Sequence, residues 1–319
     1  MATSAMFPPT RRRWLVVALA VVAVVAAIAG ARLWLAADDP PLDPLEPVPA
    51  GSLLAVPPSG PVIVIMLENK NERSILDATD APYLQSLFDT GAVATEYQAV
   101  AHPSEPNYLA LFSGSTQGVT DNGSHDLNAP TIADQLENAG KTWGVFAENL
   151  PAVECFTGET SSGGPDGDGD YARKHEPAIS FTAISGSPQR CANIKPLRDF
   201  RPDAADFSWI IPNLCHDMHD CSVAEGDAWL ASVVQPILAS PAFAPGGSGT
   251  LYITFDESDG KAADNEIVTT VLGPKVKAGT RSDVAHSHYS LLRTIETSLG
   301  LPCLAQACEA NTLGELFQP

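Results

Sequence analysis

Acidic and amide side chains follow two strongly apolar segments of this sequence. Glu68 and Asn69 close the first segment, and Asp256 and Glu257 close the second. Apolar, β-branched runs are typical of strands buried on both faces of a parallel sheet, and ligands bind beyond the carboxyl ends of such strands. Grouped carboxylate and amide oxygens suit a hard divalent cation. We therefore expect a metal site here, with simple helix capping by Asn69 or Asp256 as the alternative.

A serine in the segment HPSEPNYLALFSG (102–114) is the candidate nucleophile. Ser104 stands where a helix is expected to begin, because Pro106 is tolerated in a first turn. The free N–H groups and positive dipole end of a helix hold phosphate oxygens, and a hydroxyl there beside a cation can ionise and attack phosphorus. Asn107, one turn further on, can reach the same anion. A plain serine N-cap is the alternative.

Two other polar segments could supply positive charge and protons. Lys174 and His175 lie in a basic stretch that could stabilise phosphoryl charge or protonate a leaving group. Asp217 and His219 follow a predicted strand, where they could bind a metal or act as an acid–base pair. The alternative for both segments is an ordinary solvated surface stretch.

The elements that must position these side chains alternate between strands and helices. Strands are predicted at 61–67, 92–101, 142–147, 207–211, 250–255 and 267–272. Helices are predicted at 81–90, 104–112, 131–139, 225–239 and 290–299. This alternation predicts one α/β domain with a mostly parallel central sheet and helices on both faces.

The N-terminal 37 residues read as an export segment rather than as part of the fold. Three arginines at 11–13 precede an uncharged apolar run over 14–31, which is at the length threshold for crossing a bilayer. The arginines should stay cytoplasmic, so the rest of the chain faces outward. We expect an uncleaved signal anchor, with a cleaved signal peptide as the alternative. The proline-rich stretch 38–61 is predicted to be a semi-rigid linker that leads into a domain over 62–319.

All six cysteines follow the linker. An even number of cysteines outside the cytoplasm favours disulfides over free thiols. We expect the pairing of sequence neighbours, with free buried thiols as the alternative. The expected bonds are Cys155–Cys191, Cys215–Cys221 and Cys303–Cys308. Together with the export segment, they predict an extracytoplasmic protein, either secreted or anchored by its N-terminal helix.

The composition argues against nucleic-acid binding. The chain has 18 Lys and Arg against 38 Asp and Glu, a formal net charge of −20. A nucleic-acid binder needs a basic face to meet the phosphates. The same acidity disfavours tight docking on anionic membranes.

Six motifs, in this order along the chain, resemble the phosphoesterase family. This family contains acid phosphatases and phospholipases C and is related to the alkaline-phosphatase superfamily. The motifs are Glu68-Asn69, the segment around Ser104, Lys174-His175-x-Pro, Pro212-Asn213 with Asp217-x-His219-Asp220, Asp256-Glu257, and HYSLLRT from His288. The resemblance implies an alkaline-phosphatase-like fold.

The resemblance also implies roles for individual residues. The metal ligands it implies are Glu68, Asn69, Asp256 and Glu257. It makes Ser104 the nucleophile and places His175 and His219 against phosphate, one of them as general acid. The supporting groups it implies are Lys174, Asn107, Asp217 and His288. One or two divalent metal ions fit the family, and Asp217, His219 and His288 are the candidates for a second site.

We therefore expect an exported, metal-dependent phosphatase that hydrolyses phosphate monoesters through a phosphoserine intermediate. Its expected substrate is a phosphorylated small molecule or a lipid head group, phosphoinositides included. A phosphodiesterase of the phospholipase C type is the first alternative, and a non-catalytic surface protein is the second. The length of the domain favours a compact phosphatase.

Overall fold

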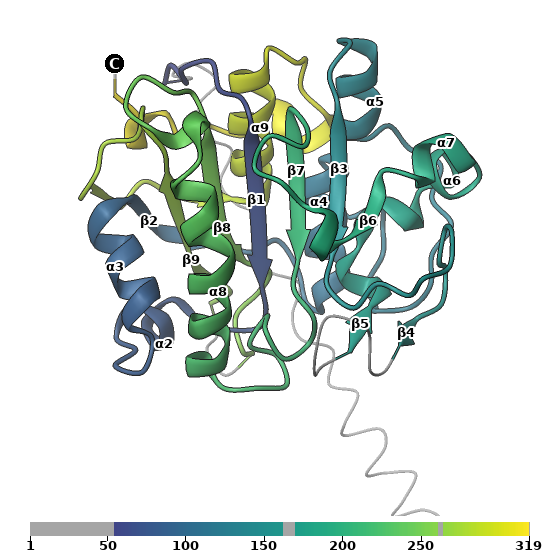
Figure 1. Cartoon of the computed structure of the whole chain (residues 1–319), viewed down its shortest axis with the longest axis horizontal. Coiled ribbons are helices and arrows are strands. Elements are labelled where there is room, and N and C mark those ends of the chain that lie inside the picture. Colours follow the sequence, from purple (N-terminus) through teal and green to yellow (C-terminus); the bar gives the residue numbers. More distant parts are fainter. Residues whose placement is uncertain (1–53, 162–169, 261–263, 319) are drawn as a thin grey trace, which may run out of the picture. The chain divides into compact units, whose positions relative to one another are not determined.

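The computed structural model describes residues 54–161, 170–260 and 264–318, which form a mixed sheet with helices on both sides (Figure 1). The strand order is β10-β2-β9-β8-β1-β7-β3-β6, and β11 also pairs with β2. The strands of this sheet are β1 (Val62–Leu67), β2 (Ala92–Gln98), β3 (Trp143–Ala147), β6 (Ile194–Pro196), β7 (Phe207–Ile211), β8 (Thr250–Phe255), β9 (Glu266–Leu272), β10 (Arg281–Ser282) and β11 (His286–Ser287). A separate pair joins β4 (Thr160–Ser161) and β5 (Tyr171–Ala172).

The sheet is mostly parallel, as predicted, with one reversed strand among those described. β9 runs antiparallel to both β2 and β8, whereas β8, β1, β7, β3 and β6 all run in one direction. Every residue of β1 and of β8 is buried. This burial explains their continuous apolar sequences, because helices cover both faces of these central strands.

Two pairs of helices flank the sheet on opposite faces (Figure 1). The helices are α2 (Glu72–Leu76), α3 (Pro82–Thr90), α4 (Ser104–Ser113), α5 (Ile132–Asn138), α6 (Thr182–Ser185), α7 (Pro188–Cys191), α8 (Val223–Leu238) and α9 (His288–Leu299). α3 packs on α8, where the Asp227 carboxylate accepts the N–H groups of Tyr83 and Leu84, and α4 packs on α9. α4 and α9 end at Gly114 and Gly300, both with φ of 71°, the left-handed conformation that glycine adopts at helix ends.

Short 3₁₀ turns connect these elements. They are η1 (Arg173–His175), η2 (Pro177–Ser180), η3 (Leu197–Asp199), η4 (Pro241–Phe243), η5 (Ala305–Cys308) and η6 (Gly314–Leu316). η1 matters most for the site, because it carries Lys174 and His175 directly after β5.

The end of the proline-rich stretch packs against the folded domain. Thr312 Oγ1 donates to the Leu54 carbonyl, and the N–H groups of Ser59 and Gly60 donate to carbonyls of α9 and of the segment before β8. Residues 54–60 of the predicted linker are therefore hydrogen-bonded to the domain. The predicted export segment and linker residues 38–53 lie outside the described residues. Among residues 54–161, 170–260 and 264–318, no helix is long and apolar enough to cross a bilayer.

Three disulfides join the cysteines in the predicted pairing. They are Cys155–Cys191, Cys215–Cys221 and Cys303–Cys308. Disulfides of this number are typical of proteins in an oxidising compartment outside the cytoplasm.

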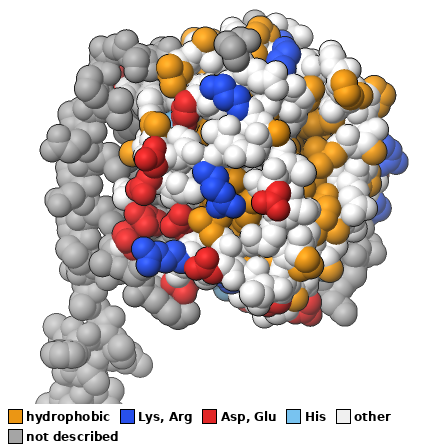
Figure 2. Space-filling model, turned by 90° about the vertical axis from the view of Figure 1, so that its left-hand side faces the viewer, with side chains coloured by type: hydrophobic (Ala, Val, Ile, Leu, Met, Phe, Trp, Pro, Cys, Tyr) orange, Lys and Arg blue, Asp and Glu red, His pale blue; other side chains and the backbone are white. Residues whose placement is uncertain are grey.

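Charged side chains are unevenly distributed on the surface. On the face drawn in Figure 2, acidic side chains gather towards one edge, and Lys and Arg side chains stand apart from one another. Hydrophobic side chains are spread over the other half of this face.

Candidate active site

Strand register brings the two acidic motifs to one edge of the sheet. β1 and β8 are parallel neighbours, and Leu67 pairs with Phe255, so Glu68 and Asp256 leave the sheet side by side. The Asn69 N–H donates to Asp256 Oδ1 over 2.9 Å, and Asn69 has a φ of 46°. The four predicted metal ligands therefore lie at the carboxyl ends of adjacent strands, as the sequence predicts.

Ser104 is the first residue of α4 and faces this edge. Its Oγ lies 3.1 Å from Glu68 Oε2 and 3.1 Å from Glu257 Oε1, and its single proton can be donated to only one of them at a time. The Lys174 ammonium is 3.5 Å from the same Oγ. The second oxygen of Glu257 contacts His102 Nδ1. Ser104 is therefore surrounded by groups that can take its proton and hold an anion.

A chain of charged groups extends behind Ser104. Glu68 Oε1 accepts from the Tyr108 hydroxyl at 2.5 Å and lies 3.1 Å from His175 Nε2. The other ring nitrogen of His175 is 3.3 Å from Asp217 Oδ2. The His175 ring stacks on the Tyr108 ring, with centroids 5.1 Å apart. Asp217, His175 and Glu68 thus form a buried series that ends at the serine.

The charges in this series favour an ion pair between Glu68 and His175. Burial alone would raise the pKa of Glu68, but the charge and hydrogen bond of His175 and the charge of Lys174 lower it to about 2. Burial alone would lower the pKa of His175, but the carboxylates of Glu68 and Asp217 raise it to about 8. At neutral pH Glu68 is therefore ionised and His175 is protonated.

His288 begins α9 and supports the backbone of the cluster. Its Nε2 is 2.7 Å from the Asp256 carbonyl oxygen, and its Nδ1 is 3.2 Å from the Tyr97 hydroxyl. Burial lowers the pKa of His288 to about 4, although the hydrogen bond to the Asp256 carbonyl opposes this. The ring is therefore neutral at physiological pH, and this bond assigns its proton to Nε2.

The acidic cluster fits a divalent cation. Asn69 Oδ1 and Asp256 Oδ2 are buried and accept no hydrogen bond from the described part of the chain. Buried polar atoms almost always have a hydrogen-bond partner, so these two oxygens are exceptional. In addition, burial together with the charges of Glu68 and Glu257 raises the pKa of Asp256. A hard cation would satisfy these oxygens and favour the ionised form of Asp256.

A second, tighter group of ligand-type atoms lies elsewhere. It consists of Cys215, Cys221 and Glu225. Its two sulfurs are joined to each other in a disulfide, so this group is not a metal site.

Two more of the predicted site residues, the supporting Asn107 and the phosphate-binding His219, have neighbours of their own. Asn107 Oδ1 accepts the N–H groups of Val100 and Ala101, and its Nδ2 donates to the Ala101 carbonyl, so this side chain holds the loop before Ser104. The His219 side chain is 34% exposed, and its Nδ1 lies 2.6 Å from Asp220 Oδ1. Thus Asp217 faces His175, whereas His219 and His288 have other partners.

Three residues of this site were not predicted from the sequence. Tyr108 lies four residues after Ser104 on α4, and this helical spacing is the one signal that could have identified it. Lys70 Nζ donates to the Met218 carbonyl at 2.7 Å and so ties the end of β1 to the segment after β7. The third residue, Glu148, follows β3 and contacts that segment from its other side.

Comparisons with known proteins assign the family. The model of the Phosphoesterase family matches residues 66–302. The chain belongs to the phosphoesterase family. A phosphatidylinositol-3-phosphatase of Mycobacterium tuberculosis is 36% identical to this phosphoesterase over 266 residues, which cover 82% of this chain and 84% of that protein. An acid phosphatase of Aspergillus fumigatus is 32% identical over 248 residues, which cover 74% of this chain and 55% of that protein, so this phosphoesterase spans about half of that relative.

Solved structures confirm the predicted fold of this phosphoesterase. The lipoteichoic acid synthase LtaP of Listeria monocytogenes superposes with a TM-score of 0.58 at 10% identity, covering 85% of this chain and 79% of that one. A protein of the alkaline phosphatase superfamily from Vibrio parahaemolyticus gives a TM-score of 0.51 at 14% identity, covering 85% and 75%. The phosphatase relatives and the family match together support a phosphoric monoester hydrolase.

Proposed function

We propose that this chain is an exported phosphatase that hydrolyses phosphate monoesters through a phosphoserine formed on Ser104. The observation that carries the proposal is the position of Ser104 Oγ. It lies at the start of α4, between two carboxylates at 3.1 Å and with the Lys174 ammonium at 3.5 Å. A helix N-terminus and an ammonium hold phosphate oxygens, and the carboxylates can accept the proton of the serine.

The proposed cofactor is a divalent cation. Its ligands would be Glu68, Asn69, Asp256 and Glu257. The unpartnered buried oxygens Asn69 Oδ1 and Asp256 Oδ2 support this choice. When bound, the cation supplies positive charge that polarises phosphate oxygens and lowers the pKa of a neighbouring hydroxyl. The neutral ring of His288 keeps the Asp256 backbone in place for this task.

The proposed reaction has two displacement steps. In the first, Ser104 Oγ forms a bond to phosphorus as the bond from phosphorus to the leaving alcohol breaks, and its proton passes to Glu257 Oε1 at 3.1 Å. Lys174 and the Ser104 N–H hold the non-bridging oxygens, where charge is concentrated. The next two residues of α4 do not contribute, because the Glu105 N–H donates to Asn122 Oδ1 and Pro106 has no N–H. In the second, water attacks the phosphoserine and gives a proton to the group that protonated the alcohol. The bond from phosphorus to Ser104 Oγ breaks, phosphate leaves, and Glu257 returns its proton to Ser104.

We assign the proton donor for the leaving alcohol to His219 rather than to His175. Both ring nitrogens of His175 face carboxylates inside the protein, so this ring holds Glu68 in place. The His219 ring is a third exposed and is held at Nδ1 by Asp220, so its Nε2 can carry a proton to a substrate arriving from solvent.

The proposed substrates are phosphorylated small molecules and phosphoinositide head groups. The similarity to a phosphatidylinositol-3-phosphatase, which covers 84% of that relative, supports the second class. The disulfides and the arginine-led apolar segment support export, with residues 1–37 as a membrane anchor or as a cleaved signal.

A comparison of two ester classes tests this proposal. The full chain is assayed with p-nitrophenyl phosphate and with bis(p-nitrophenyl) phosphate, before and after EDTA, alongside Ser104→Ala. We expect turnover of the monoester, a loss of at least about 10³-fold in Ser104→Ala, and loss of activity in EDTA. Preferential hydrolysis of the diester would indicate a phosphodiesterase, and near-wild-type turnover by Ser104→Ala would exclude a phosphoserine on this residue.

A further inference from the structure

Glu148 has no part in the reaction described above, yet it is buried and accepts three hydrogen bonds. It follows β3 and is only 4% exposed. Its Oε2 accepts from the Asn213 N–H at 3.1 Å and lies 2.8 Å from His216 Nδ1, and its Oε1 accepts from Trp229 Nε1 at 3.1 Å. The carboxylate thus joins the end of β3, the segment after β7, and α8.

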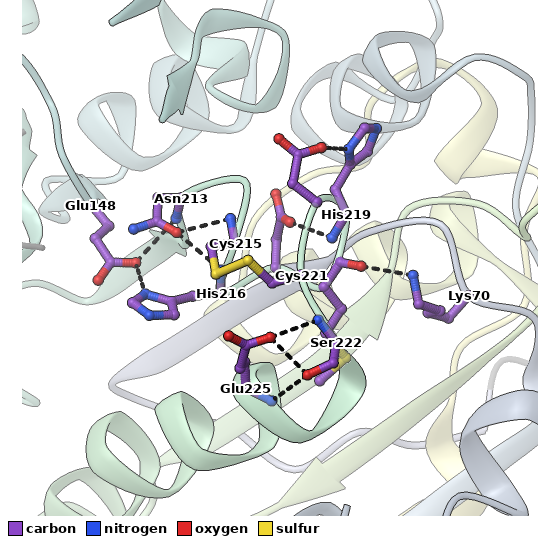
Figure 3. The surroundings of a disulfide bond; sticks show 12 residues. Lys70, Glu148, Asn213, Cys215, His216, His219, Cys221, Ser222 and Glu225 are labelled. Atoms are coloured by element: carbon purple, nitrogen blue, oxygen red, sulfur yellow. Dashed lines mark hydrogen bonds and ion pairs between the residues drawn. A yellow bond between two sulfur atoms is a disulfide. The ribbon is translucent and has the colours of Figure 1, made fainter. Parts of the chain in front are cut away.

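Two of these partners belong to one loop, residues 213–221, which we call the Asp217 loop (Figure 3). The Asn213 side-chain oxygen accepts the N–H groups of Cys215 and His216. The Asn213 carbonyl accepts the Asp217 N–H at 2.9 Å. Glu148 therefore connects to Asp217 through a single residue, Asn213.

The opposite side of the Asp217 loop lies against the catalytic edge of the sheet. The Asp217 carbonyl accepts the Glu68 N–H at 2.8 Å, and the Met218 carbonyl accepts Lys70 Nζ (Figure 3). Asp217 Oδ2 lies 3.3 Å from His175 Nδ1. A shift of the loop would therefore change the contact between Asp217 and His175, and through it the position of Glu68.

We propose that Glu148 is a positioning residue that sets the Asp217 carboxylate against His175. It acts from behind the loop through Asn213 and His216, and does not itself touch the substrate. The stacking of the His216 ring on Trp229, at 5.8 Å between centroids, holds the imidazole in the plane that its contact with Glu148 requires. The inference rests on the proposed phosphatase function, because it concerns the geometry of that site.

Replacing the carboxylate by an amide tests the idea with little change in volume. A carboxylate only accepts hydrogen bonds, whereas the side chain of glutamine has one accepting oxygen and one donating NH₂ group. In Glu148→Gln the NH₂ group would face at least one of the three groups that now donate to Glu148, which are the Asn213 N–H, His216 Nδ1 and Trp229 Nε1. One of these donors then lacks an acceptor, and the Asp217 loop must move or lose a bond. Misplacement of a catalytic constellation by about 1 Å can cost about 100-fold in rate.

The experiment is a double-mutant cycle in the full chain, supplied with a divalent metal. Glu148→Gln, Asp217→Asn and the double variant are compared with wild type by kcat, KM and melting temperature. We expect Glu148→Gln to lower kcat about 10- to 100-fold with KM changed less than about threefold. The substrate is p-nitrophenyl phosphate, whose phenolate leaves without a proton, so displacement of His219 in the same loop costs little. In the Asp217→Asn background the same change should then cost less than about threefold, because the contact between Asp217 and His175 has already been lost.

A matched control is Glu296→Gln, another buried glutamate bonded to side-chain N–H, here that of Gln135. It should keep kcat within about twofold of wild type. The proposal is overturned if Glu148→Gln folds and keeps wild-type kcat. It is also overturned if the fold-loss of kcat in the double variant equals the product of the fold-losses in Glu148→Gln and Asp217→Asn. A wild-type chain without phosphatase turnover would instead remove the proposed function, and this inference with it.

A second variant covers the case in which Glu148→Gln does not fold. His216→Phe keeps a ring against Trp229 and leaves the Asn213 bond to Glu148 intact. We expect a smaller loss of kcat and the same dependence on Asp217. Equal losses in the wild-type and Asp217→Asn backgrounds would overturn the proposal.

Discussion

At the scale of single residues, His219 should separate substrates by their leaving group. If it protonates the departing oxygen, His219→Ala should lower kcat for an alkyl phosphate by about 10²- to 10⁴-fold. The loss should be much smaller for p-nitrophenyl phosphate, because its phenolate leaves without a proton. Steady-state kinetics with both substrates provide the measurement, and equal losses on both would assign the proton transfer to another group.

Glu296 offers a pH-dependent prediction far from the chemistry. Burial raises its pKa to about 7, although Gln135 and Arg293 oppose the shift. The folded state therefore holds this proton more tightly than the unfolded chain, so the contribution of Glu296 to stability is present below about pH 4.5 and lost as pH rises towards 7. Glu296→Gln should remove this pH dependence, which amounts to a change of up to about 3 kcal/mol in the free energy of unfolding.

Urea unfolding of both proteins at pH 5 and at pH 8 measures this effect. Glu105 and Glu176, whose pKa values burial also raises to about 7, are present in both proteins, so the difference isolates Glu296. An unchanged gap in unfolding free energy between the two pH values would show that Glu296 does not titrate in this range.

Residue types at strand and helix ends could be interpreted from the sequence, but their partners could not. Glu68 and Asp256 were identifiable because each ends an apolar strand, and Ser104 because it begins a helix. Tyr108 stands in an apolar helix where an aromatic ring looks like core, and only the fold brings it to Glu68. Asn107 was predicted to bind the phosphate anion of the substrate, and that role stays a prediction. In the structure its side-chain oxygen accepts hydrogen bonds from the loop before Ser104.

At the scale of elements, the disulfides offer a controlled comparison. Cys215–Cys221 and Cys303–Cys308 close loops of similar length, with sequence separations of 6 and 5, so their removal should free similar amounts of chain entropy in the unfolded state. Only the first bond encloses Asp217. We expect replacement of Cys215 and Cys221 by serine to lower kcat at least about tenfold, by freeing the Asp217 loop.

Replacement of Cys303 and Cys308 by serine should leave kcat within about twofold of wild type, although both variants lose stability. Steady-state assays well below each melting temperature separate the two effects. Equal losses of kcat in both variants would show that the Cys215–Cys221 bond acts through global stability alone.

The positions of the elements followed from the sequence better than their directions did. Hydrophobic runs placed β1 and β7 within one residue of the observed bounds, because such runs reflect burial. The antiparallel direction of β9 could not be predicted in this way, because a buried strand has the same apolar sequence whether it pairs in parallel or antiparallel. The three short strands β6, β10 and β11 have two or three residues each, too few for any periodicity to appear.

At the scale of the whole molecule, cation binding should be measurable as stability. Buried carboxylates of like charge meet at the ends of β1 and β8, and a ligand that binds only the folded state stabilises it by about 2.7 kcal/mol at 100 times its dissociation constant. We expect EDTA to lower the melting temperature by several degrees and a divalent metal to restore it. Ser104→Ala should respond in the same way, whereas equal melting curves with and without EDTA would contradict the metal site.

The packing of residues 54–61 predicts where the folded unit begins. Besides the bonds from Thr312 and to α9, the Pro58 carbonyl accepts Lys275 Nζ at 2.6 Å, and Val56 is buried. At about 1 kcal/mol net for each hydrogen bond, a chain that starts at residue 62 should lose a few kcal/mol relative to one that starts at residue 54. Urea unfolding of the two fragments measures this difference. Equal unfolding free energies would mean that residues 54–61 are a spacer after all, because their contacts would then add nothing to the stability of the domain.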